Sequence, residues 1–316
     1  MWPGRRPCPP GLRRGTLEGW PGHVNENWSG LRMTDKSTIW TAWFQGRKRA
    51  PRHVQRIFRL WEDLNPDRRL HVIEGAEADN ILESIGVCQV RMTPQIKSDL
   101  IRLVILKEHG GVWVDSTLLP VIPLSGWINQ LLEPTGFFAF RSSGDPNLVL
   151  QSWFLASDAN NPLVSNWCDL FVDYFQSQRC WMNWKRAVYH VKFRDYIRHY
   201  IATRRKDMIW LVDPDQGRDC FFYPYMAICY NFAYLVRANQ DMREMWERVP
   251  TRWHTLPELA GAVAADPETP IESFHRIVRE VLPHAPVHKL NHHDQRFDAV
   301  VSHARELIGL PDDAIR

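Results

Sequence analysis

The fold of this chain can be worked out from residues 110–115, which read Gly110-Gly111-Val112-Trp113-Val114-Asp115. The glycine pair is typical of the end of a helix, because glycine accepts backbone conformations that other residues avoid. The three apolar residues after it predict a short buried strand, and Asp115 follows that strand directly. In an open α/β sheet, ligands bind outside the carboxyl ends of the strands, so Asp115 is a candidate binding and catalytic residue. Aspartate at a strand end is also common as a turn or cap residue, which is the alternative interpretation.

A helix is predicted immediately before this strand. Thr93-Pro94 supplies an N-cap and a first-turn proline. An apolar stripe follows at helical spacing and consists of Ile96, Leu100, Val104 and Ile105. Asp99 and Arg102 stand three residues apart on this helix and project from one face. One acceptor and one cation can therefore point at the same ligand, with a surface ion pair between them as the alternative.

The neighbouring segments predict an α/β fold with an open sheet. Residues 39–44 form a β-branched and aromatic run, residues 54–64 repeat apolar side chains at helical spacing, and residues 70–73 resume an extended apolar run. Together they predict a β-α-β unit. Two further strands and a mainly helical, aromatic-rich portion are expected downstream, at residues 137–140, 153–156 and 162–248.

Composition excludes several classes of protein. The chain has 316 residues, of which 44% are hydrophobic and 24% charged, as is usual for a globular protein and unlike a disordered or fibrous one. The net charge of +3 comes from lysines and arginines spread along the chain, with no concentrated basic run. Nucleic-acid binding is therefore not expected, and a small anionic ligand suits the charge at least as well.

The cysteines and the hydropathy pattern bear on the compartment. The six cysteines contain no C-x-x-C pair and match no small disulfide framework, so reduced thiols in a cytoplasmic protein are expected. The sequence contains no apolar run of the roughly 20 residues that a membrane span needs. Peripheral contact with the inner face of the membrane stays open, and the oligomeric state is undetermined.

Five motifs, in their order along the chain, resemble the capsular polysaccharide synthesis family. They are Trp40-Thr41-Ala42-Trp43-Phe44-Gln45-Gly46, Ala50-Pro51, Leu64-Asn65-Pro66, Ser98-Asp99 with Arg102, and Gly110-Gly111-Val112-Trp113-Val114-Asp115. The resemblance covers about residues 39–160 well and is thin beyond them. Members of this family are glycosyltransferases of the GT-A fold, similar in their core to glycosyltransferase family 32. The resemblance therefore implies a GT-A-type, Rossmann-like open sheet with a largely helical C-terminal portion.

The resemblance also implies roles for individual residues. Trp43 is expected to stack on the base of a nucleotide-sugar donor, with simple packing as the alternative. Asp99 and Arg102 are expected to contact the donor sugar and diphosphate, and Asp115 to take part in catalysis and in binding the metal and diphosphate. Gly46 and Gly111, each from one of the motifs, are also expected to line the donor-binding site.

A divalent cation, Mn²⁺ or Mg²⁺, is the cofactor that the resemblance implies. Many relatives carry an Asp-x-Asp motif whose second carboxylate also serves the metal, whereas this chain reads Asp115-Ser116-Thr117. His288, in a predicted loop at residues 286–294, is a candidate for the missing ligand, and Lys289 beside it is a candidate phosphate contact. A histidine in a loop is more often solvated or held by neighbours than bound to a metal.

The predicted function is transfer of a sugar from a nucleotide-sugar donor to a glycan or other surface-polysaccharide precursor, retaining and metal-assisted. The alternatives are a catalytically degenerate carbohydrate- or nucleotide-binding protein of the same fold and, less favoured, a nucleic-acid-binding protein. The predicted organisation is a disordered leader at residues 1–35, rich in proline and glycine, and one domain at 36–316. Met33 is an alternative start to Met1. The domain divides into a donor-binding core, a helical acceptor side and a closing segment, at residues 36–160, 160–250 and 251–316.

Overall fold

The computed structural model describes residues 38–87, 92–176, 208–214, 224–291 and 296–311. Contacts between Cα atoms group Met33–Arg316 into one compact unit. The predicted leader at residues 1–35 lies outside the described residues, and the division of the domain into three parts stays a prediction.

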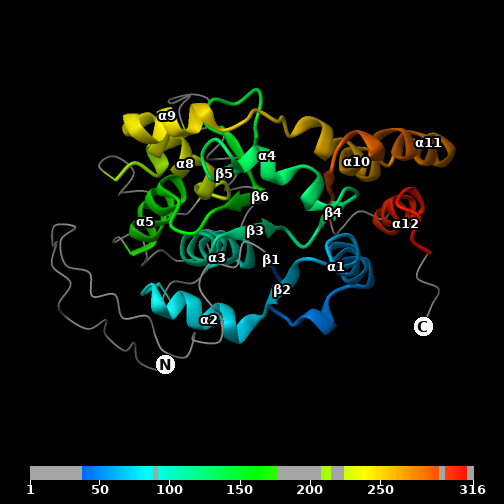
Figure 1. Ribbon diagram of the computed structural model, residues 1–316, viewed down its shortest axis with the longest axis horizontal. Coiled ribbons are helices and arrows are strands. Elements are labelled where there is room, and N and C mark those ends of the chain that lie inside the picture. Colours follow the sequence, from blue (N-terminus) through cyan, green and yellow to red (C-terminus); the bar gives the residue numbers. More distant parts are fainter. Residues whose placement is uncertain (1–37, 88–91, 177–207, 215–223, 292–295, 312–316) are drawn as a thin grey trace, which may run out of the picture. The chain divides into compact units, whose positions relative to one another are not determined.

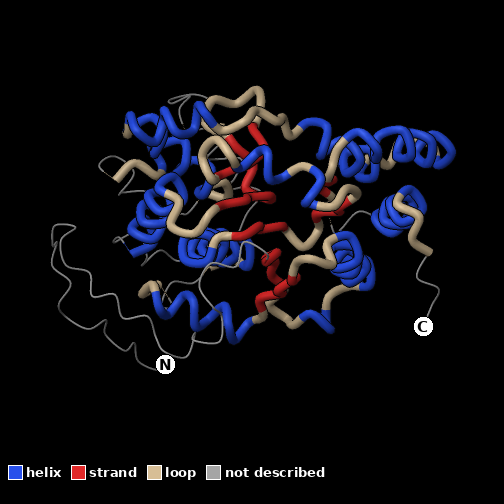
Figure 2. The backbone as a smooth tube through the Cα atoms, in the orientation of Figure 1, coloured by secondary structure: helices blue, strands red, loops and turns tan. Residues whose placement is uncertain are grey.

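The centre of the unit is a five-stranded sheet in the order β2-β1-β3-β6-β5 (Figures 1 and 2). Its strands are β1 (Thr38–Ala42), β2 (Arg69–Ile73), β3 (Gly111–Val114), β5 (Phe137–Arg141) and β6 (Leu150–Ser157). β1 is parallel to β2 and to β3, whereas β6 is antiparallel to both β3 and β5. Four strands therefore point the same way and β6 points the other way, which confirms the predicted α/β class with an open sheet.

The amino-terminal half follows the predicted β-α-β pattern. Helix α1 (Arg52–Leu64) links β1 to β2, α2 (Gly75–Ser84) follows β2, and α3 (Pro94–His109) leads into β3. The Thr93 hydroxyl accepts a hydrogen bond from the Ile96 amide at 3.3 Å, as expected of an N-cap. α3 packs between the sheet and α5 (Pro162–Gln176).

The glycine pair between α3 and β3 is required by geometry. Gly110 and Gly111 have φ angles of 67° and 94°, which side chains rarely tolerate. A Cβ atom on Gly111 would lie 2.6 Å from the carbonyl oxygen of Thr38 in β1. These two residues therefore let the chain leave the helix and pair at once with β1.

Helices make up most of the described chain after β6, as predicted. They include α8 (Ala227–Ala238) and α9 (Gln240–Arg248), which pack on α5 through an aromatic cluster. In that cluster the Phe232 ring lies 4.7 Å from Trp167 and 5.0 Å from Trp246, measured between ring centroids, and all three side chains are buried. These aromatics form core and not an open acceptor surface. Other aromatics of the predicted acceptor side lie outside the described residues, among them Trp181, Trp184, Tyr189, Tyr196, Phe221 and Phe222.

The closing segment returns to the carboxyl end of β3. It contains α10 (Thr255–Ala265), α11 (Ile271–Val281), β7 (Val287–Lys289) and α12 (Phe297–Leu307), and these elements gather beside α1 and β4 (Leu118–Pro120) in Figure 1. β7 pairs antiparallel with β4, with Leu118 opposite Lys289. The prediction of a loop at residues 286–294 is therefore wrong for its first part, where the chain forms the short strand β7.

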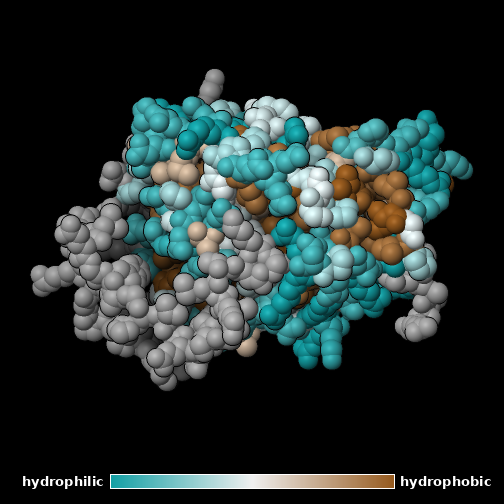
Figure 3. Space-filling model, in the orientation of Figure 1, coloured by the Kyte–Doolittle hydropathy of each residue, from teal (hydrophilic) through white to brown (hydrophobic). Residues whose placement is uncertain are grey.

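Part of the surface of the closing segment is apolar. Figure 3 shows hydrophobic surface between α10 and α12, and these two helices carry the exposed side chains Leu256, Leu259 and Leu307. Among the helices that the structure describes, none has the length and apolar character needed to cross a membrane. Peripheral membrane contact stays a prediction.

Candidate active site at the carboxyl end of β3

The carboxyl ends of three parallel strands meet at one edge of the sheet. β1 and β2 end in register, with Ala42 opposite Ile73, and the Trp43 amide donates to the Ile73 carbonyl at 3.0 Å. Asp115 follows β3 at the same edge. Because β6 runs in the opposite direction, the aspartate that follows it, Asp158, lies at the other edge. The site therefore forms at the edge that carries Asp115, and Asp158 lies at the opposite edge.

A tight turn after β3 sets the position of Asp115. Its amide donates to the Trp153 carbonyl of β6 at 2.9 Å, and its carbonyl accepts from the Leu118 amide at 2.8 Å. This turn brings Thr117 next to the Asp115 carboxylate, whose side chain remains 25% exposed. Asp115 is thus fixed by backbone hydrogen bonds on both sides and still reaches solvent.

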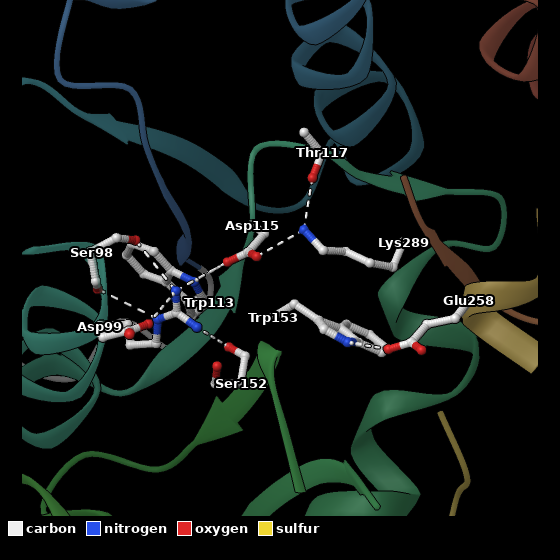
Figure 4. A network of polar contacts seen from close by, with 10 residues as sticks. Ser98, Asp99, Trp113, Asp115, Thr117, Ser152, Trp153, Glu258 and Lys289 are labelled. Carbon is white, nitrogen blue, oxygen red and sulfur yellow. Dashed lines mark hydrogen bonds and ion pairs between the residues drawn. The ribbon is translucent and has the colours of Figure 1, made fainter. Parts of the chain in front are cut away.

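Three donors hold the two carboxylate oxygens of Asp115 (Figure 4). Oδ1 accepts from an Arg102 guanidinium nitrogen at 3.2 Å and lies 3.3 Å from Trp113 Nε1. Oδ2 accepts from Lys289 Nζ at 2.9 Å, and the same ammonium donates to the Thr117 hydroxyl at 2.8 Å. One carboxylate therefore stands between two cations that come from different parts of the chain.

Arg102 is buried and its hydrogen-bonding groups are occupied. Its guanidinium pairs with Asp99 at 3.0 Å as well as with Asp115, donates to the Ser152 carbonyl, and lies 5.1 Å from the centroid of the Trp113 ring. Asp99 and Arg102 are only 7% and 4% exposed. The alternative of a surface ion pair is therefore wrong for these two residues.

The two carboxylates around Arg102 titrate in opposite directions. Burial raises the pKa of Asp99 to about 7, because the Arg102 charge only partly offsets desolvation and the Asp115 charge adds to it. Burial alone would also raise the pKa of Asp115, but the charges of Lys289 and Arg102, with hydrogen bonds from Lys289 and Trp113, hold it below its usual range. Asp115 is thus ionised at neutral pH, where Asp99 is close to the midpoint of its titration.

The other predicted donor-binding residues divide between the two edges of the sheet. Trp43 and Gly46 lie at the carboxyl edge, in a turn closed by a 2.9 Å hydrogen bond from the Gly46 amide to the Trp43 carbonyl. Beyond this turn, the Arg47 amide donates to Glu74 at 2.8 Å. Gly111 starts β3, so the structure puts it at the opposite end of that strand from Asp115. Gly111 serves the close approach of β1 and β3 and is not brought to the site.

His288 is not brought to Asp115 either. Neighbouring residues of a strand point to opposite sides, and Lys289 is the one that faces Asp115. The His288 side chain is fully buried, and its Nε2 lies 2.9 Å from the Leu282 carbonyl. Burial lowers the pKa of this imidazole, as expected for a neutral histidine in the core.

Two more groups lie near the site, and no sequence motif pointed to either of them. Tyr225 is 71% exposed, and desolvation, followed by the charges of Asp99 and Asp115, raises the pKa of its hydroxyl. Glu258 of α10 accepts a hydrogen bond from Trp153 Nε1 at 3.1 Å. This contact ties the closing segment to β6 beside the site (Figure 4).

The described residues do not fit a divalent cation at Asp115 while Lys289 holds its position. They contain no group of three or more histidine, cysteine, aspartate or glutamate side chains that could hold a metal ion. At an effective dielectric constant of about 20, a divalent ion about 4 Å from one carboxylate gains roughly 8 kcal/mol. An ammonium about 4 Å from the same ion repels it by roughly the same energy, so the charge of Lys289 cancels the attraction of Asp115 for the ion. Hard cations also need several oxygen ligands, and here the Asp115 and Thr117 oxygens are shared with Lys289.

The arrangement suits binding of an anion. Two cations flank an ionised carboxylate at a partly open edge, where it orients both of them. Charge that develops on a phosphate during a reaction is stabilised by such preorganised donors. Lys289, with a side chain that is 27% exposed, is better placed to meet an incoming ligand than Arg102, at 5%.

Comparison with known proteins connects this site to a family. The family model described as capsular polysaccharide synthesis protein matches residues 26–203, which is more than half of the chain. An initiation-specific alpha-1,6-mannosyltransferase of Candida albicans is 30% identical over 102 residues, covering 29% of this chain and 26% of that protein. The O-glycosyltransferase braB of Annulohypoxylon truncatum is 25% identical over 161 residues, covering 44% of this chain and 38% of that protein. The match thus spans well under half the length of both curated relatives.

A solved structure is also similar over much of the chain. The ligand-free glycosyltransferase domain from the YGT toxin covers 87% of this chain and 99% of its own, with 10% sequence identity and a TM-score of 0.41.

Proposed function

Because this chain belongs to the capsular polysaccharide synthesis protein family, we propose that it is a glycosyltransferase. It moves a sugar from a nucleotide-sugar donor to a glycan or another surface-polysaccharide precursor. The observation that carries this proposal is the ionised Asp115 at the carboxyl edge of the sheet, held between Arg102 and Lys289.

The donor diphosphate is the part of the substrate that this charge arrangement serves. In the transfer, the bond between the anomeric carbon and the diphosphate oxygen breaks, and its electron pair stays on the diphosphate. The acceptor hydroxyl oxygen forms the new bond, and its proton leaves to the departing phosphate or to solvent. The diphosphate gains negative charge in this step, which positive groups fixed beforehand stabilise strongly.

Asp115 has two roles in the proposed site. It fixes the positions of Arg102 and Lys289 through its two oxygens. An ionised carboxylate offers about four acceptor positions, and three donors use it here, so one position remains for a hydroxyl of the donor sugar. This position is reachable because the side chain is a quarter exposed.

The nucleoside and the acceptor occupy the two sides of Asp115 in this proposal. The nucleobase stacks on Trp43 beyond the ends of β1 and β2, where Gly46 allows the tight turn. The acceptor enters from the side of Tyr225 and α10. Retention at the anomeric carbon is part of the same proposal and rests on the family resemblance. A cytoplasmic location, with contact at the inner face of the membrane, is also part of it and rests on the cysteine pattern and the hydropathy of the sequence.

Turnover of nucleotide sugars tests the proposal. Purified protein is incubated with a panel of nucleotide sugars, and the release of nucleoside diphosphate is measured with and without a simple sugar acceptor. We expect turnover of at least one donor, with retained configuration in the product by NMR. Asp115→Asn is expected to lower that turnover about 10²- to 10³-fold.

A matched control is Asp158→Asn, because Asp158 also follows a strand of the sheet but at the opposite edge. Its turnover should stay near that of the wild type. Equal losses in the two variants, or no turnover of any donor, would contradict the proposal. Binding of a donor without turnover would instead identify a nucleotide-sugar-binding protein.

A further inference from the structure

Lys289 brings a positive charge to the place beside Asp115 where a metal-binding Asp-x-Asp motif would hold its cation. It comes from 174 positions further along the chain, and its ammonium bridges the Asp115 carboxylate and the Thr117 hydroxyl. Thr117 is the third residue of Asp115-Ser116-Thr117, so a hydroxyl stands where the Asp-x-Asp motif would offer its second carboxylate, and the Lys289 ammonium contacts both residues.

We propose that Lys289 binds the diphosphate of the donor in place of a divalent cation, so that donor binding and sugar transfer proceed without a metal. This inference rests on the proposed glycosyltransferase function and names the group that neutralises its leaving diphosphate. It differs from the expectation of Mn²⁺ or Mg²⁺ that the family resemblance raises.

The hydrogen-bonding capacity of Lys289 supports this role. An ammonium has three N–H donors, and the described residues engage two of them, through Asp115 and Thr117. The third can meet a phosphate oxygen, and lysine is a common phosphate ligand as a compact point charge. Arg102, by contrast, already pairs with Asp99, Asp115 and the Ser152 carbonyl, so it has little left for a ligand.

The backbone around Lys289 is fixed as a ligand site requires. The Leu290 amide donates to the Thr117 carbonyl at 3.1 Å, which extends the β4–β7 pairing to the residue after Lys289. On the other side, Gly261 of α10 lies so close that a Cβ there would be 2.2 Å from the Lys289 carbonyl oxygen. β7 is thus held between β4 and α10, and Lys289 faces Asp115 as a consequence.

The first test measures binding by calorimetry of UDP, GDP and inorganic pyrophosphate, in EDTA and in MnCl₂. We expect the wild type to bind at least one of these probes in EDTA, with an affinity that Mn²⁺ changes by less than about threefold. Lys289→Met, which keeps an unbranched side chain only one atom shorter and removes its charge, should weaken binding about 10- to 100-fold in both buffers. Lys289→Arg keeps the charge and should bind closer to the wild type.

Lys107→Met is the matched control. Lys107 also pairs with one carboxylate, Asp169, and its side chain is 32% exposed, but it lies in the last turn of α3, away from Asp115. Binding by this variant should equal that of the wild type. Binding of the probes only in MnCl₂, no binding in either buffer, or equal losses in Lys107→Met and Lys289→Met would overturn the proposal.

A second test rebuilds the metal site. The double variant Lys289→Ala with Thr117→Asp removes the ammonium and restores two carboxylates at the spacing of Asp-x-Asp. Its turnover of the donor should rise at least about tenfold from EDTA to MnCl₂, whereas turnover by the wild type should be equal in both buffers. Loss of wild-type turnover in EDTA, restored by MnCl₂, would overturn the proposal even if no variant folds.

Failure of the proposed function is distinguishable from failure of this inference. A chain that is not a glycosyltransferase turns over no donor in either buffer, whatever its binding of diphosphates. A metal-dependent glycosyltransferase turns over a donor in MnCl₂ and not in EDTA. Only a metal-independent glycosyltransferase turns it over equally in both.

Discussion

Two segments meet at Asp115, and each brings one cation to it. The first is α3 with β3, in which Arg102 lies 13 positions before Asp115, and the second is the closing segment, in which Lys289 lies 174 positions after it. The Arg102 side chain is 5% exposed and has several partners, whereas that of Lys289 is 27% exposed. The comparison indicates that the nearby cation mainly holds the site together and that the distant cation meets the ligand.

The largest expected effect separates these two roles directly. Arg102→Met leaves Asp99 and Asp115 without their shared buried partner, which should lower the free energy of unfolding by about 3–5 kcal/mol. Lys289→Met breaks a partly exposed pair and should lower it by about 1 kcal/mol or less. Urea unfolding of the two variants measures this, and equal losses of stability would remove the distinction between the two cations.

Asp99, the buried carboxylate of the first segment, should make the free energy of unfolding depend on pH, by an amount similar to or smaller than the effect of Arg102→Met. The pKa of Asp99 is about 7 in the folded chain and near 3.8 in the unfolded chain, so the folded state keeps a proton that the unfolded state has lost between these values. The contribution of Asp99 to the free energy of unfolding is fully present below pH 3.8 and is lost as the pH rises to about 7. Relative to Asp99→Asn, the wild type should therefore lose up to about 4 kcal/mol over this window. Urea unfolding from about pH 5 to pH 8 measures most of the change, and a stability difference that stays constant with pH would contradict the assignment.

A smaller effect is expected where α10 holds the second segment. Gly261→Ala forces the helix and β7 apart and should cost about 1–3 kcal/mol of stability. It should also lower donor turnover, because Lys289 moves with β7. Gly126→Ala is the control, since a Cβ there would meet only Ile122 at an ordinary 3.6 Å. The test is thermal melting and donor turnover of the two variants. Normal turnover in a destabilised Gly261→Ala would show that α10 does not position Lys289 for the reaction.

The first segment could be predicted from sequence because its signals are local. Thr93 caps α3, the glycine pair ends it, and the apolar run before Asp115 forms β3, all within 25 residues of one another. The position of Asp115 at the carboxyl edge then follows from the parallel pairing with β1. Burial of Asp99 and Arg102 could not be predicted, because it depends on β6 and on the helices packed against α3.

The second segment could not be predicted because its position depends on contacts that are distant in sequence. β7 has only three residues, which is too short a run to be recognised as a strand from the sequence, and its partner β4 is equally short. Which of two neighbours, His288 or Lys289, faces Asp115 is set by the register of β7 against β4. The direction of each strand in the sheet is likewise set by long-range pairing, and because β6 runs opposite to β3, Asp158 lies at the far edge from Asp115.

The central claim is that the Asp115 edge binds a donor diphosphate through Lys289 and without a metal. A crystal structure with the nucleoside diphosphate that binds best, grown with MnCl₂ present, tests it most directly, because manganese is identified by its anomalous scattering. The account predicts a phosphate oxygen within hydrogen-bond distance of Lys289 Nζ and no manganese between the diphosphate and Asp115. Manganese bound to Asp115 with Lys289 turned away, or a diphosphate bound elsewhere, would contradict it.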